Sequence, residues 1–438
     1  MTWDDKLRAA LGRPASARER GILSALTALM LFGLMGGTKL LPRTAAGAHP
    51  FVSALALSVP AALLLLGLCD LLRRGAGTRA ALGLGCALVG VGMALRLGFL
   101  PHRSSDYEIY LARWMDAFAS SGFSEAMRGD IGEYNVLYQY LLFLAARLPM
   151  PGLTALKAIS LMGDAMLCWG IGRLGGKRGG LAFALALLLP SMALNGAMFA
   201  QCDALYAAFA LWALVFAGRG RDRVSVVCFA LCLCMKLQAL FLFPVIPVLW
   251  LRGRLRLRDL PVFFGTLLLV ALPALLGGKT PAQILAIYAG QTGLYTGLSY
   301  NAPTLFGLME TQGLDVYLYG RWGILLAMGA ALALIAYGTH REMDDLGMLW
   351  LSTLCAALVV FLLPRMHERY FFLALALAIP LAVQRPRHLP VLALLELASV
   401  SRLLEMGISL RAGSLMVLLA LTLLMIPLER RTDPYETR

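Results

Sequence analysis

The stretch LGMLWLSTLCAALVVFLLPRMHERYFFLALALAIPLAVQ, residues 346–384, joins two apolar runs through a short polar segment, 364–370. A helix that crosses a membrane needs roughly 17–25 mostly apolar residues. The runs 346–363 and 370–384 therefore predict two membrane helices, the second a short one. The ionisable side chains at their junction are Arg365, His367, Glu368 and Arg369. Such groups are costly at membrane depth, and their presence there indicates a functional role.

The composition of the whole chain is that of a polytopic membrane protein. Of its 438 residues, 59% are hydrophobic and 15% are charged, whereas soluble domains have about 45–50% apolar and about 25% charged residues. In a soluble protein the net charge of +14 would point to a nucleic-acid partner. Here the arginines lie in short loops between apolar runs, where they indicate topology. We therefore expect an all-α polytopic fold in a lipid bilayer and no nucleic-acid partner.

Apolar runs along the rest of the chain predict about 12–14 transmembrane helices. The run 136–149, about 14 residues long, is too short to cross and is expected to form an interfacial or re-entrant helix. Segment 224–251 is either one long helix or a hairpin bent near Lys236. The remaining predicted spans are 21–42, 51–72, 80–100, 155–174, 180–199, 204–218, 259–277, 321–339, 388–402 and 408–427.

The distribution of Lys and Arg predicts how these helices are oriented. The N-terminal tail and the short loops between spans are basic, so both termini are expected on the cytoplasmic side of the cell membrane. Residues 101–154, 278–320 and 364–370 then lie outside. The predicted parts are a tail with an extra transmembrane hairpin (1–79), the main transmembrane module (80–277), a long external loop (278–320) and C-terminal helices that carry the polar segment (321–438).

The first predicted external loop contains a candidate general base. Asp106 lies shortly after a span, in a position where a carboxylate can take a proton from an acceptor hydroxyl. The aromatic residues around it, Tyr107, Tyr110 and Trp114, have helical spacing and also fit an interfacial aromatic belt. Glu133, further along the loop, is either part of a helix cap or a substrate-binding residue.

Two further polar groups interrupt apolar sequence. Gln201 and Asp203 follow a span and are too polar for a lipid-facing surface, so they either bond to neighbouring helices or line a cavity. Lys236 and Gln238 break a long apolar run. Lys236 either snorkels to the membrane surface or pairs with an anionic group of the substrate, for which a phosphate is the obvious candidate. The two arginines of segment 364–370 can likewise bind phosphate oxygens in a bidentate manner. His367 can add a hydrogen-bond donor or shuttle a proton. The alternative is that this segment is only a solvated turn.

The order of these motifs resembles the GT-C superfamily of integral membrane glycosyltransferases, and most of all bacterial relatives of the second mannosyltransferase of GPI-anchor synthesis. The chain departs from that pattern in having Ala200 where relatives often have Gly, and 135–137 where relatives often have a Pro-Pro pair. The motifs that carry the resemblance are Ser105-Asp106-Tyr107 with Trp114, Pro190 with Gln201 and Asp203, Lys236 and Gln238 with Pro244, Asn301-Ala302-Pro303, and Arg365 to Tyr370.

The resemblance implies a GT-C-like fold that transfers a sugar, with a mannose-like hexose favoured, from a polyprenyl-phosphate carrier. The acceptor is lipid- or glycan-linked, transfer occurs on the external face, and the anomeric carbon is inverted. Asp106 matches the base and Asp203 a second acidic residue of the family. No cofactor is required, although a divalent cation shared by Asp106 and Asp203 is left open.

The resemblance and the residue chemistry together give a set of expected site residues. The donor phosphate is assigned to Arg365, His367, Arg369 and Lys236. The expected substrate-binding residues are Tyr107, Glu133, Gln201, Asp203, Gln238, Asn301, Glu368 and Tyr370. The main alternative is a non-catalytic transporter or lipid flippase, since such proteins also bury ions among their spans. A third possibility is a ligase or acyltransferase that uses His367.

Overall fold

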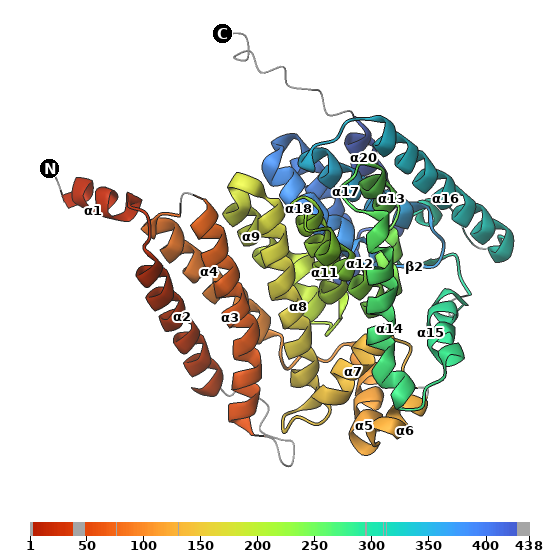
Figure 1. Cartoon of the computed structure of the whole chain (residues 1–438), viewed down its shortest axis with the longest axis horizontal. Helices are drawn as coiled ribbons and strands as arrows, with labels where there is room; N and C mark the ends of the chain where they lie inside the picture. The colour runs from red at the N-terminus through yellow and green to blue at the C-terminus, as the bar shows by residue number, and fades with distance from the viewer. Residues whose placement is uncertain are drawn as a thin grey trace, which may run out of the picture. The chain divides into compact units, whose positions relative to one another are not determined.

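The computed structural model describes residues 3–37, 49–75, 77–129, 131–293, 296–309, 311 and 313–426. The described chain is almost entirely helical (Figure 1) and divides into two compact units, Met1–Gly297 and Leu298–Arg438. We call them the N-terminal and the C-terminal unit. Their boundary falls inside the predicted external loop 278–320. The predicted cytoplasmic C-terminus, 427–438, lies outside the described residues.

Six helices among the described residues are long and apolar enough to cross a membrane. A seventh crossing is present if a pair of helices bent by 53° counts as one span. The prediction of an all-α protein with membrane-spanning helices is confirmed at this level, while the GT-C-like arrangement and the number of 12–14 spans stay predictions. The six are α3 (Pro50–Arg74), α4 (Arg79–Gly98), α8 (Gly152–Leu174), α14 (Leu260–Leu276, with the preceding turn η4, Leu257–Asp259), α16 (Val316–His340) and α17 (Asp345–Leu362).

The N-terminal unit begins with α1 (Trp3–Gly12) and α2 (Ala17–Gly37), followed by the hairpin of α3 and α4. Helix α3 packs closely on α8 because small residues lie in the interface. A Cβ added at Gly67 would lie 3.0 Å from the Trp169 ring, and one at Gly172 would lie 2.4 Å from Leu71. Small residues of this kind let membrane helices approach closely, so the predicted N-terminal hairpin is anchored to the rest of the unit.

The segment between α4 and α8 folds into short helices instead of a span. It contains the π-helical turn η1 (Tyr107–Leu111), α5 (Ala112–Ser120), α6 (Phe123–Arg128) and α7 (Val136–Ala145). Helix α7 is the only part of 136–149 that is α-helical, and its length is well below that of a membrane crossing. These helices lie at the end of the N-terminal unit opposite to the end where α4 begins (Figure 1).

Two predicted spans of the N-terminal unit are interrupted. The run 180–199 bends at Pro190 into α9 (Gly179–Leu188) and α10 (Pro190–Ala197), because proline cannot donate the helical hydrogen bond. The run 224–251 is likewise broken at Lys236, which agrees with one of the two alternatives predicted for it. After the break the chain enters a tight turn. The other elements of this unit are η2 (Gly176–Arg178), α11 (Asp203–Ala217), α12 (Asp222–Met235), η3 (Leu237–Phe241), α13 (Val245–Leu251) and α15 (Pro281–Gly293).

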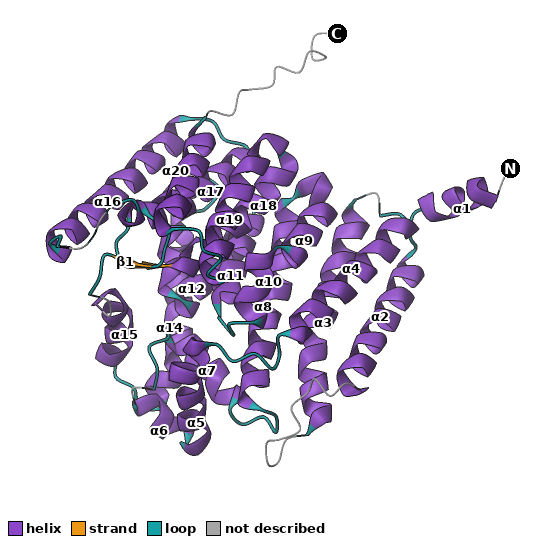
Figure 2. Cartoon of the chain, turned by 180° about the vertical axis from the view of Figure 1, so that it is seen from behind, coloured by secondary structure: helices purple, strands orange, loops and turns teal. Residues whose placement is uncertain are grey.

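The C-terminal unit is built around α18 (Phe372–Gln384), whose residues from Phe372 to Val383 are all buried and which contacts α17 and α19 (Leu389–Leu403). The polar segment 364–370 does not form a simple turn. It contributes the short strand β2 (Met366–His367), which pairs in parallel with β1 (Ser299–Tyr300) (Figure 2). The remaining elements are η5 (Leu305–Gly307), η6 (Glu368–Phe371), η7 (Pro386–His388) and α20 (Leu410–Met425).

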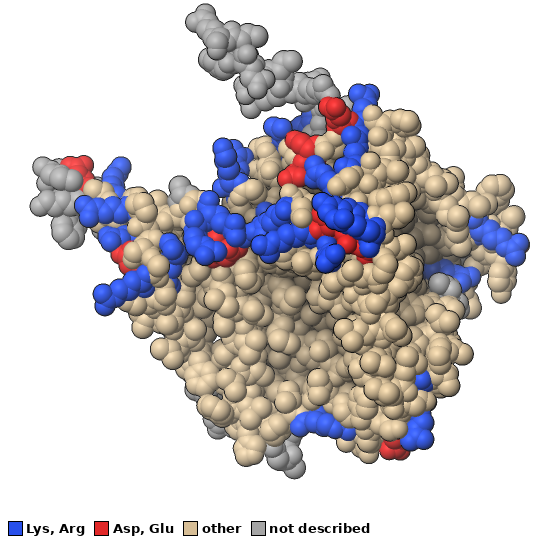
Figure 3. All heavy atoms as spheres, in the orientation of Figure 1, with Lys and Arg blue, Asp and Glu red and all other residues tan. Residues whose placement is uncertain are grey.

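Basic side chains of the N-terminal unit gather at the helix ends that were predicted to face the cytoplasm. Arg73 and Arg74 end α3, and Lys177 and Arg178 form the turn before α9. In the space-filling view, Lys and Arg form a band along this edge of the unit, while the surface beside it is almost uncharged (Figure 3).

Candidate functional site

The backbone that presents Asp106 is held by two buried side chains. The Lys157 ammonium, fully buried on α8, donates hydrogen bonds to the carbonyls of Phe99 at 2.5 Å and His102 at 2.7 Å, and so caps the end of α4. The Ser104 hydroxyl accepts a hydrogen bond from the Tyr107 amide and donates one to the Phe199 carbonyl. The Lys157 bonds attach this loop to α8, and the Ser104 bond to Phe199 attaches it to the turn after α10, so together they restrict where Asp106 can lie.

Asp106 immediately precedes the π-helical turn η1, in which the Ala112 amide donates to the Tyr107 carbonyl. Single π-turns inside helices occur frequently at functional sites. The wider turn adds a residue before the regular helix α5 begins, and this sets the direction of every side chain that follows. The sequence did not predict this turn.

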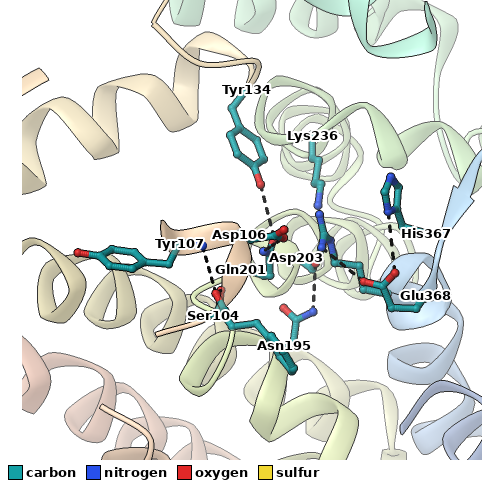
Figure 4. A network of polar contacts seen from close by, with 12 residues as sticks. Ser104, Asp106, Tyr107, Tyr134, Asn195, Gln201, Asp203, Lys236, His367 and Glu368 are labelled. Carbon is teal, nitrogen blue, oxygen red and sulfur yellow. Dashed lines mark hydrogen bonds and ion pairs between the residues drawn. The ribbon is translucent and has the colours of Figure 1, made fainter. Parts of the chain in front are cut away.

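The Asp106 carboxylate is held by Gln201, which reaches it from a part of the chain far away in sequence. Gln201 Nε2 donates to Asp106 Oδ2 at 2.8 Å, and the Tyr134 hydroxyl donates to Gln201 Oε1 at 3.4 Å (Figure 4). Gln201 is only 2% exposed. The Gln201 amide donates through its nitrogen and accepts through its oxygen. Its nitrogen therefore orients the Asp106 carboxylate by binding one carboxylate oxygen, while its own oxygen is held by Tyr134.

The backbone just before Gln201 is strained. Ala200 has a φ of 55°, in the left-handed region that suits glycine. Its amide donates to the Gly196 carbonyl, and the Gln201 amide donates to the Asn195 carbonyl, so the chain doubles back at the end of α10. Glycine would adopt this conformation without strain, whereas alanine adopts it at an energetic cost.

A buried ion pair lies at the start of α11. The Lys236 ammonium donates to Asp203 Oδ1, and Asn195 Nδ2 donates to Asp203 Oδ2 at 3.1 Å (Figure 4). The rings of Tyr134 and Tyr206 each lie 5.9 Å from Lys236 Nζ, within range of a cation–π attraction. Lys236 is buried and therefore does not snorkel to the surface. Its charge is neutralised by Asp203.

The break at Lys236 results from its backbone conformation. Helix α12 ends at Met235, and Lys236 is extended, with φ −156° and ψ 141°, before the turn η3 begins. This conformation takes Lys236 off the helical path, and its side chain reaches Asp203. Gln238, two residues later, is half-buried, and its Oε1 atom has no hydrogen-bond partner among the described residues.

Helix α10 is positioned by a second buried ion pair, which the sequence did not reveal. Arg96 of α4 bonds to Asp164 of α8 at 2.8 Å, and its guanidinium also donates to the Leu187 carbonyl at 2.8 Å. Leu187 lies where α9 ends before the bend, so Arg96 supplies a donor to a carbonyl at the interrupted helix. Asp164 in turn packs against Gly196 of α10, next to Asn195.

Two expected substrate-binding residues of segment 101–154 lie apart from this network. The Tyr107 ring points away from Asp106 (Figure 4), and its burial raises the pKa of the hydroxyl. Glu133 is exposed, and its backbone carbonyl accepts a hydrogen bond from Gln291 at 2.8 Å. The structure thus joins Asp106, Gln201, Asp203 and Lys236 to Tyr134 and Asn195, which were not among the expected site residues.

The C-terminal unit forms a separate polar cluster around His367. Its ring stacks on Tyr300 at 5.3 Å and contacts Tyr370 at 5.3 Å, and its Nδ1 lies 3.9 Å from Glu368 Oε2 (Figure 4). Glu368 also lies 3.6 Å from the Arg369 guanidinium. One local arrangement therefore contains four of the expected residues of segment 364–370, namely His367, Glu368, Arg369 and Tyr370.

Asn301 joins the same cluster through its backbone, which bridges to His367, and through its side chain, which accepts a hydrogen bond from Arg402 of α19. Asn301 and Arg365 both have positive φ values, 62° and 64°. Two strained residues at one short strand pair indicate that the surrounding structure enforces this geometry. Arg402 was not predicted, because it resembles an ordinary basic residue at the end of a helix.

No family model matches this chain, and a search of curated proteins finds no match either. Among the described residues there is also no group of three or more His, Cys, Asp or Glu side chains that could hold a metal ion. A carboxylate oriented by an amide suits proton abstraction, and cationic side chains suit an anionic ligand.

Proposed function

We propose that this protein is a membrane glycosyltransferase that moves a sugar, with a mannose-like hexose favoured, from a polyprenyl-phosphate carrier to an acceptor on the extracytoplasmic face. The observation that carries this proposal is the Asp106 carboxylate, held at 2.8 Å by the buried amide of Gln201. An unpartnered surface carboxylate would have no such support. A base must be fixed within reach of the proton that it removes, and this arrangement fixes it.

The proposed reaction is a single displacement with inversion. The acceptor oxygen attacks the anomeric carbon while the bond from that carbon to the phosphate oxygen breaks, and the polyprenyl phosphate leaves with the bonding electrons. Asp106 takes the proton of the acceptor hydroxyl. The reaction needs no nucleotide, because the lipid phosphate is itself the leaving group.

The leaving phosphate requires cations, since its negative charge grows as the bond breaks. In the C-terminal unit we assign this role to Arg365 and Arg369, with His367 as a further donor. In the N-terminal unit we assign Lys236 as a cation whose charge is balanced by Asp203 before substrate binds. Each assignment is tested by itself, within its own unit.

The proposed orientation is supported by the charges of the N-terminal unit. The basic helix ends, with Arg73 and Arg74 on α3 and Lys177 and Arg178 before α9, fit the cytoplasmic surface of a cell membrane. The short helices α5, α6 and α7 lie at the other end of this unit (Figure 1). We therefore infer that both termini are cytoplasmic and that Asp106 acts outside.

A transporter or lipid flippase is the second candidate, and one observation favours it. The ion pair of Lys236 and Asp203 is buried at a helix break, and ionisable pairs at broken helices are typical of transporters. Such a protein would move a polyprenyl-phosphate sugar across the membrane and leave its bonds intact.

The test is to incubate the protein, purified in lipid nanodiscs, with a panel of polyprenyl-phosphate sugars and candidate acceptors, and to measure the release of polyprenyl phosphate. Asp106→Asn should lower the rate by about 10²–10⁴-fold, the usual effect of losing a general base. Asp116→Asn is the matched control, since Asp116 is an exposed carboxylate of the same segment, on α5, and its rate should be unchanged. Near-normal turnover by Asp106→Asn would remove Asp106 from the mechanism. Movement of intact donor across liposomes, without release, would favour the transporter.

A further inference from the structure

A row of aromatic rings leads from the surface of the external segment to the Asp106 network. Tyr110 and Trp114 lie 6.0 Å apart, Trp114 and Tyr134 lie 5.6 Å apart, and Tyr134 and Tyr138 lie 4.8 Å apart. Tyr110 is 49% exposed, Trp114 and Tyr134 are half-buried, and Tyr138 is fully buried. The row therefore begins at the surface and ends in the interior.

The backbone around these rings is shaped to bring them together. The π-helical turn precedes Trp114, and Gly132, with a φ of 76°, lies against the indole. A Cβ at position 132 would be 3.0 Å from the Trp114 ring, so only glycine allows both this turn and this approach. The Trp114 indole thus packs against the loop that carries Gly132 and Tyr134.

The aromatic row is joined to the proposed base by hydrogen bonds. The Tyr134 hydroxyl donates to Gln201, which donates to Asp106. An interfacial aromatic belt needs no such link, because its rings rest among lipid headgroups. A ligand lying along the exposed part of the row would have one end directed toward Asp106.

We infer that Tyr110 and Trp114, followed by Tyr134, form the acceptor subsite and that they stack on a sugar ring, so the acceptor presents a saccharide and not a bare polyprenol. This inference rests on the proposed function. The C–H faces of a pyranose pack on aromatic rings, while its hydroxyls need polar partners at the edge. Glu108 and Arg113 are exposed charged residues close to these rings in the sequence, and they can supply such polar partners. An isoprenoid chain has no polar groups along its length and would gain nothing from them.

The experiment is saturation-transfer NMR on the full chain in lipid nanodiscs, with mannobiose and maltose as saccharide probes, mannitol as an acyclic polyol and a short polyprenol as the lipid probe. The expected result is that signal transfers to the ring C–H protons of the saccharides. Tyr110→Ala and Trp114→Ala should weaken saccharide binding by roughly threefold to tenfold, the scale of one lost aromatic contact. Trp114→Phe keeps a ring and should retain most of the binding.

Ile109→Ala is the matched control, because Ile109 is an exposed apolar neighbour, 48% exposed, that is not part of the row. Saccharide binding that is absent in the native protein, or unchanged in Tyr110→Ala and Trp114→Ala, would overturn the inference. Equal loss of polyprenol binding in Tyr110→Ala and Ile109→Ala, without loss of saccharide binding, would instead assign the rings to the membrane surface. Asp106→Asn separates the two proposals, since it should abolish transfer and leave saccharide binding intact.

Discussion

Gln201 Nε2 lies 2.8 Å from Asp106 Oδ2, a hydrogen bond that joins residues 95 positions apart in the chain. The bond links the end of the bent α9–α10 pair to the π-helical turn that follows Asp106. It makes the candidate base dependent on the fold of four helices, since α10 is itself held against α4 and α8 by Arg96 and Asp164.

Gln201→Leu should lower the rate of sugar transfer by about 10–100-fold and leave donor affinity unchanged. Leucine has a similar volume but cannot donate to Asp106, so the carboxylate loses its orientation while the protein stays folded. Single-turnover rates and donor titrations separate the two effects. Gln283→Leu serves as the control, because the half-buried Gln283 side chain of α15 bonds to Thr280 and to the Arg128 carbonyl rather than to Asp106, so its rate of transfer should match that of the native protein. A normal rate for Gln201→Leu would show that Asp106 needs no support from this amide.

Removing either partner of the buried ion pair should destabilise the protein, and removing both should restore stability. Asp203→Asn leaves the Lys236 ammonium unpaired in a buried place, which typically costs about 3–5 kcal/mol. The double variant, Asp203→Asn with Lys236→Met, removes both charges and should recover most of that free energy of unfolding. Denaturant titration of the native protein, both single variants and the double variant gives the coupling energy. Strict additivity of the single effects would mean that the pair contributes nothing as a pair.

Transfer activity should not recover in the same double variant if Lys236 acts on an anionic substrate group. A double variant that is both stable and fully active would assign the pair to structure alone. The stability and activity measurements therefore distinguish a structural role from a functional role for Lys236.

Ala200→Gly should raise the free energy of unfolding by up to about 1 kcal/mol. The left-handed conformation at φ 55° costs alanine about 1–2 kcal/mol, part of which is offset by the greater freedom of glycine in the unfolded chain. Ala197→Gly, at the end of α10, is the control with the opposite sign, because glycine weakens a helix by about 0.5–1 kcal/mol. Equal destabilisation by both substitutions would contradict the strain at position 200.

Arg365→Gly should lower donor affinity by roughly ten- to hundredfold without loss of stability. Arg365 has a φ of 64°, and its amide donates to the Leu298 carbonyl at 2.8 Å, so glycine relieves the backbone and keeps this bond. The lost guanidinium removes a charge-assisted hydrogen bond to phosphate, which contributes about 1.5–3 kcal/mol. Arg365→Lys should restore binding only in part, because lysine lacks the fork. Titration with a polyprenyl-phosphate sugar measures the effect, and unchanged affinity in the glycine variant would make this segment purely structural.

Cysteine labelling should place Ser120 outside the cell and Arg219 inside. Both residues are exposed, on α5 and after α11 respectively, so each can be replaced by cysteine and probed with a membrane-impermeant maleimide. The native background is low, because seven of the eight cysteines are buried and the other, Cys69, is half-buried. Ser120→Cys should react in intact cells, and Arg219→Cys only after permeabilisation. The reverse pattern would invert the topology and move Asp106 to the cytoplasmic side.

Much of the secondary structure could be predicted from the sequence, because a membrane helix is specified by local composition. The run 346–363 is matched by α17, and the run 321–339 lies within α16. The interruption near Lys236 was one of the two predicted alternatives, since a lysine and a glutamine in an apolar run are a local signal. The bend at Pro190 lay inside a predicted span, and proline was the signal that could have located it.

The site was predictable only in its residue types. Asp106, Gln201, Asp203 and Lys236 stand out in the sequence because polar groups among apolar runs are costly. Which of them pair was not predictable: Asp203 neutralises Lys236, and Gln201 holds Asp106. The strand Met366–His367 within 364–370 was not predictable either, because its partner, Ser299–Tyr300, lies far away in the chain.

The sequence by itself determined that this chain is a helical protein with membrane-spanning segments and where its ionisable groups lie, because hydrophobicity over a helix length is a local property. Only the tertiary structure decided the partners of those groups, the π-helical turn at Asp106 and the left-handed conformations at Ala200, Asn301 and Arg365. Hydrogen bonds and ion pairs act over a few ångströms. Which atoms come that close depends on how distant helices pack, and no local stretch of sequence specifies that.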